Sequence, residues 1–237
     1  MAVRPIVIGH RGWPQRYPEN TLVSFEAALE LGCEALECDL HLSRDGHVMV
    51  MHDADVSRTT DGEGRIQDKT LAEMKQLDAG SWLDAKFAGE RVPTYEEMLA
   101  VVPADVPIYA EVKDGRPEMV DKLLPLVAPR AATTIVHSFH SDFLEAFHRA
   151  APSFRTGLLG NASKLDMAAE ARRLGCTGIH PCIEGVTREV VAGWQAEGFE
   201  IMMWTVGDEA SCRQFLALEA ESIAADCPDL LLRLRGA

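Results

Sequence analysis

Eight short segments with the composition of buried β-strands recur along this chain, and helical patterns separate most of them. Strands that alternate with helices predict a parallel sheet, and eight such units predict that the sheet closes into an α/β barrel of the (β/α)8 or TIM type. The predicted strands cover residues 6–9, 35–41, 108–112, 134–138, 155–158, 178–181, 201–206 and 222–226.

The spacing of apolar residues predicts helices between these strands. In residues 21–31, Leu22, Phe25 and Leu29 fall on one helical face, and Gly32 provides a C-terminal stop. The other predicted helices cover residues 94–101, 117–127, 141–150, 165–174, 188–197 and 208–218. Because single barrels commonly run to about 250 residues, we expect one domain over residues 1–237.

The segment after the second strand breaks this alternation. Asp45-Gly46 between two strand-like runs predicts a two-residue hairpin turn. In that register Arg44 faces His47, and Asp39 faces His52. Residues 53–91 are rich in Gly, Asp and Thr and hold one short helical pattern near 71–77. We expect this stretch to be a small insertion over the mouth of the barrel.

The charge balance excludes several classes of partner. The chain has 23 Lys and Arg against 37 Asp and Glu, a net charge of -14, which argues against nucleic-acid binding and anionic membranes. No apolar run has the length of a signal-peptide core or a membrane span, so we expect a cytoplasmic protein without stable membrane anchoring. The six cysteines form no C-x-x-C pair and are expected to be free, mostly buried thiols. The oligomeric state is left open.

Three carboxylates fall where the predicted strands end, the position of the active site in such barrels. Glu37 and Asp39 are two residues apart and share one face of a strand, and Glu111 closes the next strand. Three carboxylates at one place repel each other unless positive charge lies among them. One divalent cation, Mg²⁺ or Ca²⁺, would satisfy them and would also polarise a phosphate.

Two histidines and two cationic side chains converge on the same place. His10 and Arg11 follow the first strand, Lys113 follows the third, and the hairpin brings His52 beside the carboxylates. Arg11 and Lys113 would supply positive charge for a phosphoryl group. Because histidine titrates near neutral pH, His10 and His52 can act as general base and general acid.

Each of these features alone also has a structural interpretation. A pair of charged residues on a strand belongs to an ion-pair network more often than to a catalytic site, by about three to one. A single histidine is at least as often structural. The combination at three strand ends favours catalysis. Of the other histidines, His137 and His180 end strands and could line the pocket, and most of the rest are expected to be solvated or structural.

A long, ordered set of motifs covers nearly the whole chain. The motifs are His10-Arg11-Gly12, Pro18-Glu19-Asn20-Thr21, Glu37-Cys38-Asp39, Asp45-Gly46, His52-Asp53, Arg58-Thr59-Thr60-Asp61-Gly62, Pro93-Thr94, Glu111-Val112-Lys113, Ser138-Phe139 and Trp204-Thr205-Val206. Together they resemble the motifs of the glycerophosphodiester phosphodiesterases. The resemblance implies a (β/α)8 barrel with a small insertion and a divalent cation.

The resemblance also implies a role for each site residue. It implies metal ligands at Glu37, Asp39 and Glu111, and catalytic histidines at His10 and His52. Arg11 and Lys113 match its phosphate-contacting positions. Phe139 and Trp204 match positions that line the pocket for the glycerol or alcohol part of the substrate. The family often carries Asn where this chain has Gly207, so a polar contact from that side chain is absent.

The expected reaction is the metal-dependent hydrolysis of small glycerophosphodiesters to glycerol-3-phosphate and an alcohol such as choline, ethanolamine or glycerol, as part of glycerol and lipid metabolism. Water could attack directly, or the neighbouring glycerol hydroxyl could attack first and give a cyclic phosphate. We favour His10 as base and His52 as acid, with the reverse assignment open. One alternative is a phosphodiesterase of the lysophospholipase D type. A sugar-phosphate isomerase or aldolase on the same barrel and a binding protein without catalysis are more distant.

Overall fold

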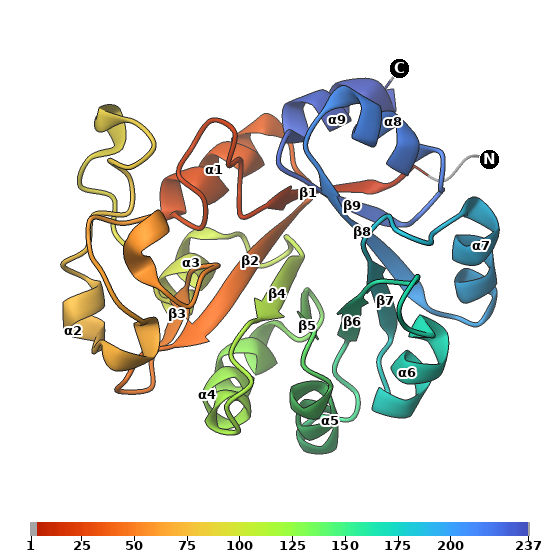
Figure 1. The fold of residues 1–237 in the computed structure, drawn as a ribbon, viewed down its shortest axis with the longest axis horizontal. Helices are drawn as coiled ribbons and strands as arrows, with labels where there is room; N and C mark the ends of the chain where they lie inside the picture. The colour runs from red at the N-terminus through yellow and green to blue at the C-terminus, as the bar shows by residue number, and fades with distance from the viewer. Residues whose placement is uncertain (1–3, 237) are drawn as a thin grey trace.

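A computed structural model describes residues 4–236, whose strands form one sheet closed on itself (Figure 1). The strand order is β1-β9-β8-β7-β6-β5-β4-β2-β3, and β1 also pairs with β2. Eight strands pair in parallel, whereas β3 is antiparallel to β2, so the predicted (β/α)8 barrel is confirmed. The strands are β1 Ile6–His10, β2 Ala35–Leu42, β3 Val48–Val50, β4 Ile108–Val112, β5 Thr134–Ser138, β6 Thr156–Gly160, β7 Gly178–Pro181, β8 Glu200–Val206 and β9 Ser222–Ala225.

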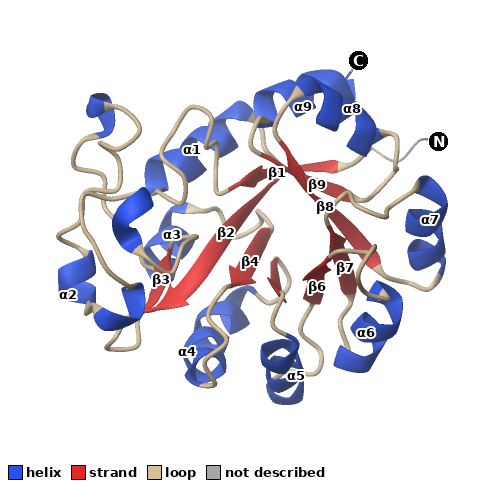
Figure 2. Ribbon diagram, in the orientation of Figure 1, coloured by secondary structure: helices blue, strands red, loops and turns tan. Residues whose placement is uncertain are grey.

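Helices connect the barrel strands and surround them (Figure 2). The α-helices are α1 Leu22–Leu31, α2 Leu71–Met74, α3 Tyr95–Val101, α4 Glu118–Val127, α5 Ser141–Ala150, α6 Met167–Leu174, α7 Arg188–Ala196, α8 Glu209–Leu216 and α9 Pro228–Gly236. Short 3-10 helices are η1 Val56–Arg58, η2 Ile66–Asp68, η3 Ala85–Phe87 and η4 Ala128–Arg130. Within residues 4–236, no helix combines the length and the apolar character needed to cross a bilayer.

The helix boundaries follow local sequence signals. As predicted, α1 begins after Thr21 and ends at Gly32, which takes the left-handed conformation (φ 103°) and donates its N–H to the last turn. At α3, the Thr94 side chain accepts from the Glu97 N–H, and the Glu97 carboxylate accepts from the Thr94 N–H. This capping box fixes the start of α3 immediately after the long segment that follows β3.

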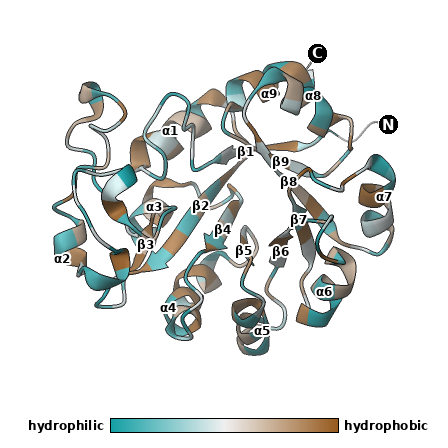
Figure 3. Ribbon diagram, in the orientation of Figure 1, coloured by the Kyte–Doolittle hydropathy of each residue, from teal (hydrophilic) through white to brown (hydrophobic). Residues whose placement is uncertain are grey.

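The core has two layers, one inside and one outside the barrel. The outer layer packs the strands against the helices, and α4 and α5 accordingly mix teal and brown in Figure 3, as expected for helices with one buried face. The inner layer consists of the apolar residues Ile8, Ala35, Tyr109, Ile135, Met202 and Ala224. All six cysteines are free and five are buried, as the sequence predicted.

The hairpin between β2 and β3 differs from the prediction by one residue. His41 pairs with Met49, and the Met51 N–H bonds to the Asp39 carbonyl, so Asp39 faces Met51 and not His52. The predicted pairing of Arg44 with His47 is wrong for the same reason. The Ser43 N–H bonds to the His47 carbonyl and closes a three-residue loop that includes Gly46 in the left-handed region (φ 82°).

The segment from 53 to 91 packs on a small apolar cluster of its own. Met51, Val56, Ile66 and Met74 form this cluster with neighbouring side chains. In Figure 1 the segment lies to the left of the barrel, beside α1 and α3. Our prediction placed it over the barrel mouth. Arg58, near the start of the segment, contacts Asp53 and Glu19 at the edge of the site described below.

Candidate active site

A cavity of about 220 Å³ opens at the carboxyl ends of the barrel strands. All the predicted site residues except Asp39 line it, namely His10, Arg11, Glu37, His52, Glu111, Lys113, Phe139 and Trp204. Asp39 lies behind this surface with no exposed area. In a (β/α)8 barrel this end of the sheet carries the active site, so the fold and the ionisable residues indicate the same location.

The three predicted carboxylates meet in this cavity. Glu37 and Asp39 project from the same face of β2, and Glu111 lies opposite Asp39 in the register of β4. All three are buried, and one ligand oxygen from each lies within 4.8 Å of the others. Such a set of carboxylate oxygens could hold a metal ion, and it suits a hard divalent cation.

The pKa values of these carboxylates indicate that the site needs added positive charge. Burial, together with repulsion from Asp39, raises the pKa of Glu37 well above its ordinary value and that of Glu111 to about 7. Burial also acts to raise the pKa of Asp39, but Arg11 and Lys113 outweigh it and lower that pKa. Glu37 Oε1 is buried and has no hydrogen-bond partner among residues 4–236. A divalent cation fits this donor set because it would neutralise the acids and give that oxygen a partner.

The cationic side chains Arg11 and Lys113 flank Asp39. Arg11 Nε lies 3.1 Å from Asp39 Oδ2, and Lys113 Nζ lies 3.2 Å from Asp39 Oδ1 and 2.5 Å from Glu111 Oε1. Arg11 adopts a left-handed backbone conformation (φ 57°), and its N–H donates to Glu37 Oε2, 3.0 Å away. Strain of this kind is typical of functional sites. The next residue, Gly12, has no room for a side chain, because an added Cβ would lie 2.3 Å from Ser24 Oγ.

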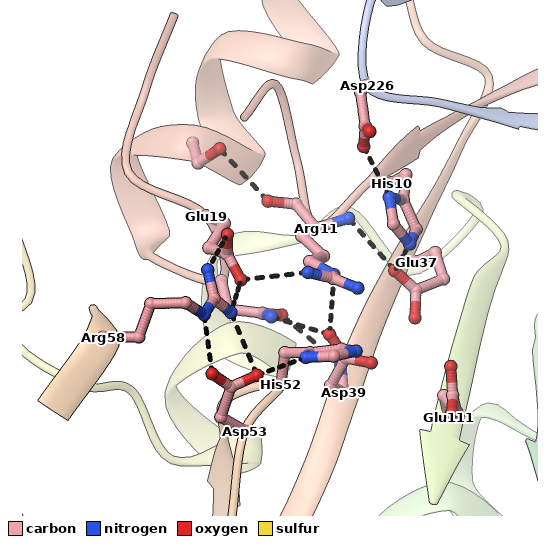
Figure 4. Close-up of polar contacts among 12 residues, drawn as sticks. His10, Arg11, Glu19, Glu37, Asp39, His52, Asp53, Arg58, Glu111 and Asp226 are labelled. Atoms are coloured by element: carbon pink, nitrogen blue, oxygen red, sulfur yellow. Dashed lines mark hydrogen bonds and ion pairs between the residues drawn. The ribbon is translucent and has the colours of Figure 1, made fainter. Parts of the chain in front are cut away.

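His10 is held by the carboxylate of Asp226, the residue directly after the last barrel strand. Its Nδ1 lies 2.6 Å from Asp226 Oδ1, and its Nε2 lies 3.8 Å from Glu37 Oε2 (Figure 4). Because an ionised carboxylate only accepts hydrogen bonds, Nδ1 of His10 carries the proton. In that tautomer Nε2 is the ring nitrogen without a proton, and it lies on the side of Glu37.

His52 has the same arrangement at the other side of Arg11 (Figure 4). Its Nδ1 donates to Asp53 Oδ1 at 2.6 Å, and its backbone carbonyl accepts from His41 Nε2 at 3.0 Å. Burial, partly opposed by Asp39, lowers the pKa of His52, so the ring is neutral near pH 7. The predicted hairpin register was wrong, but His52 lies two residues after the end of β3 and still lines the cavity.

Further polar residues hydrogen-bond to these groups and hold them in place. Arg58 binds Asp53 and Glu19 together, and Glu19 also accepts from Arg11 at 3.1 Å. Asn20 donates to Asp39 Oδ2 at 2.8 Å. The sequence motifs contained these four residues, but no role was predicted for them, and Asp226 was missed. Only their contacts in the folded chain connect them with the site.

The aromatic side of the cavity is formed by Phe139 and Trp204. Their rings meet edge to face, with centroids 5.6 Å apart and an interplanar angle of 86°. Trp204 Nε1 donates to the His180 carbonyl at 2.8 Å, which fixes the indole, whereas the Phe139 side chain is about half exposed (47%). Gly207 contributes its carbonyl to Gln15 and has no side chain to offer the pocket.

The comparison with known proteins agrees with this geometry. A model of the glycerophosphoryl diester phosphodiesterase family matches residues 10–230. The chain belongs to this family. A member from Caldanaerobacter subterraneus subsp. tengcongensis, a glycerophosphodiester phosphodiesterase, is 34% identical over 98% of both chains. Another, from Bacillus subtilis, is 30% identical and covers 98% of this chain and 87% of the relative.

Solved structures of the family share the fold. A phosphodiesterase from Oleispira antarctica, determined in complex with the product sn-glycerol-3-phosphate, superposes with a TM-score of 0.90 at 28% sequence identity. The match covers 98% of this chain and 97% of that protein. As a member of the glycerophosphoryl diester phosphodiesterase family, the chain is a hydrolase of the phosphodiesterase class.

Proposed function

We propose that this single barrel domain hydrolyses glycerophosphodiesters to glycerol-3-phosphate and an alcohol, with His10 and His52 as the acid–base pair. The observation that carries the proposal is the meeting of three buried carboxylates beside a cavity that both imidazoles line. The relatives named for this activity and the neighbour with bound sn-glycerol-3-phosphate support the substrate class.

The carboxylates Glu37, Asp39 and Glu111 would hold one divalent cation, Mg²⁺ or Ca²⁺. When bound, such a cation supplies Lewis-acid polarisation of a phosphate oxygen. Arg11 and Lys113 line the same cavity and would bind the phosphate and its developing negative charge. This local positive charge offsets the net charge of -14 that would otherwise repel an anionic substrate.

His10 would act as the general base. Its Nδ1 proton is directed to Asp226, so Nε2 is free to remove a proton from the nucleophile. His52 would act as the general acid: its ring, neutral near pH 7, would first take up a proton at Nε2 and would then pass it to the leaving alkoxide, since an alcohol leaves poorly as an anion. The Asp53 carboxylate stabilises the protonated ring. The nucleophile would be water or the neighbouring glycerol hydroxyl, and the second path would release a cyclic phosphate detectable by phosphorus NMR.

The proposal also covers the location of the protein in the cell and the alcohol group of its substrate. The six free cysteines suit a reducing compartment, which supports a cytoplasmic location. The proposed substrate class would place the reaction in glycerol and lipid metabolism. The alcohol would be small, such as choline, ethanolamine or glycerol. The alternative substrate, lysophosphatidylcholine, carries an acyl chain and is separated from these by assay.

The test measures glycerol-3-phosphate release from a panel of glycerophosphodiesters, with lysophosphatidylcholine in parallel, in Mg²⁺, in Ca²⁺ and in chelator. We expect release from the glycerophosphodiesters that chelator abolishes. No release from any panel member with either cation would refute the proposal. Preferred hydrolysis of lysophosphatidylcholine would favour the lysophospholipase D alternative.

Variants then separate the two histidines. His10→Ala and His52→Ala should each reduce turnover of glycerophosphocholine by at least roughly a hundredfold. A glycerophosphodiester with a 4-nitrophenol leaving group does not need protonation, so His52→Ala should retain activity on it while His10→Ala does not. The opposite pattern would reverse the assignment of acid and base, and near-normal activity of both variants on both substrates would exclude this pair.

A further inference from the structure

His137 is a buried imidazole in the wall of the catalytic cavity to which no role has been assigned above. It lies on β5 opposite Glu111 of β4, and only 1% of its surface is exposed. It lines the cavity, and its Nε2 has no hydrogen-bond partner among residues 4–236. A buried polar atom without a partner is costly, so an orphaned nitrogen at the wall of a ligand cavity points to a ligand atom that completes it.

The other nitrogen of His137 is fixed by a second histidine. His137 Nδ1 lies 2.9 Å from His180 Nδ1, and Tyr109 packs against both rings. Gly157 leaves the space that this pair requires, because an added Cβ would lie 2.2 Å from Cε1 of His180. The ring of His137 is thus held in one orientation, with Nε2 as its remaining polar atom.

This arrangement restricts what Nε2 can bind. One proton lies between the two Nδ1 atoms, so Nε2 of His137 is an acceptor in one tautomer and a donor in the other. A hydroxyl group can partner either form, since it both donates and accepts, whereas a quaternary ammonium can partner neither. The apolar side chains of Leu159, Met202 and Ala224 line the same cavity and suit the carbon chain that carries such a hydroxyl.

We propose that His137 is a specificity-determining residue whose Nε2 binds a hydroxyl of the glycerol part of the substrate, and that His180 is the positioning residue that orients it. The inference rests on the proposed function, because it takes the glycerol moiety as the occupant of the cavity. It assigns recognition of the glycerol hydroxyl to the wall of the barrel, separate from the charged residues that bind phosphate.

The test compares two ligands that differ in their hydroxyls. Binding of sn-glycerol-3-phosphate and of propyl phosphate to the cation-loaded protein is measured by calorimetry. We expect the unmodified protein to prefer sn-glycerol-3-phosphate. His137→Met should weaken sn-glycerol-3-phosphate roughly tenfold, the usual effect of one lost hydrogen bond, and leave propyl phosphate unchanged. His137→Gln, which matches Met in length but keeps a polar end, should recover part of the loss.

His148 provides the matched control. Within the part of the chain that the structure describes, its Nδ1 is also buried without a partner, but it lies on α5 against Gly175 and does not line the cavity. His148→Met should change neither affinity. Equal losses for both ligands in His137→Met, or no loss, would overturn the inference. If that variant does not fold, equal affinity of the unmodified protein for the two ligands would overturn it as well. Binding with the expected preference but no hydrolysis would instead refute the proposed function.

Discussion

Each imidazole of the proposed acid–base pair is paired with an aspartate through Nδ1. His10 bonds to Asp226 and His52 to Asp53, both at 2.6 Å. The Arg58 guanidinium hydrogen-bonded to Asp53, together with the neighbouring His52, lowers the pKa of Asp53 to about 2 despite partial burial. Asp53 is therefore ionised over the whole range in which His52 would exchange protons. The aspartates act by fixing the tautomer and the orientation of the rings.

Asp226→Asn tests this positioning role. The asparagine amide can donate to Nδ1 and so favours the tautomer with the proton on Nε2, which cannot act as a base. We expect kcat to fall by roughly ten- to a hundredfold with little change in KM and an unchanged circular dichroism spectrum, by analogy with other residues that orient a catalytic imidazole. Steady-state kinetics measure kcat and KM for the variant and the unmodified protein. Asp229→Asn, three residues further along, is the control, and equal effects of both variants would contradict the positioning role.

The residues that carry the proposed chemistry could be predicted from the sequence because they fall at strand ends, but their supporting partners could not. Asp226 is 216 positions from His10 along the chain. Its contact depends on β1 pairing with β9, which only closure of the barrel produces. Arg58 likewise reaches Glu19 through the fold of the segment after β3. Pairings of this kind carry no local signal in spacing or composition.

At the scale of elements, the sequence predicted the barrel strands and most helices to within a few residues. Two elements differ. The helix α9 was not predicted, although Pro228 stands at its first position, which proline favours. The β2–β3 hairpin was predicted with a two-residue turn because Asp45-Gly46 is typical of one. In the structure the Ser43 side chain accepts from the His47 N–H and donates to Asp45, which stabilises a loop one residue longer.

The left-handed conformation of Gly46 makes the hairpin testable. A side chain at φ 82° is strained, and an added Cβ would also approach the end of Lys122 to 3.1 Å. Gly46→Val should lower the free energy of unfolding by about 1–2 kcal/mol, whereas Gly46→Asn should cost less because asparagine tolerates this region. Urea denaturation measures both. Equal destabilisation by Val and Asn would show that the backbone conformation is not the cause.

For the whole molecule, the proposed cation site should contribute to stability. The carboxylates of Glu37, Asp39 and Glu111 come together only in the folded chain, so a cation bound there favours folding by mass action. At a hundred times its dissociation constant, Mg²⁺ or Ca²⁺ should add about 2.7 kcal/mol and raise Tm. Thermal denaturation with cation or chelator measures the effect. Glu37→Gln should reduce the increase in Tm that the cation causes, and Glu96→Gln, on the exposed face of α3, should leave it unchanged. A Tm independent of both cations would contradict the site.

Burial of two neutral histidines inside the barrel should also make the stability of the whole molecule depend on pH. Burial lowers the pKa of His180 to about 3, and burial and the neighbouring His180 lower the pKa of His137 well below its ordinary value. In the unfolded chain both would titrate near pH 6.5. Between these limits the unfolded state binds protons that the folded state does not. The free energy of unfolding is therefore not reduced by these histidines above about pH 6.5, and it decreases as the pH falls from 6.5 towards 3.

The size of this effect follows from the number of protons. Each such histidine should lower the free energy of unfolding by about 1.4 kcal/mol per pH unit below pH 6. Other groups also change the pH dependence here, including Glu111, whose pKa burial raises to about 7, so the comparison needs a variant. His180→Gln removes one proton-binding group from the unfolded chain. It should reduce the slope of the free energy of unfolding against pH, between pH 4.5 and 6, by about 1.4 kcal/mol per pH unit. Denaturation curves across this range measure it, and parallel slopes for the two proteins would show that His180 is not held neutral by the fold.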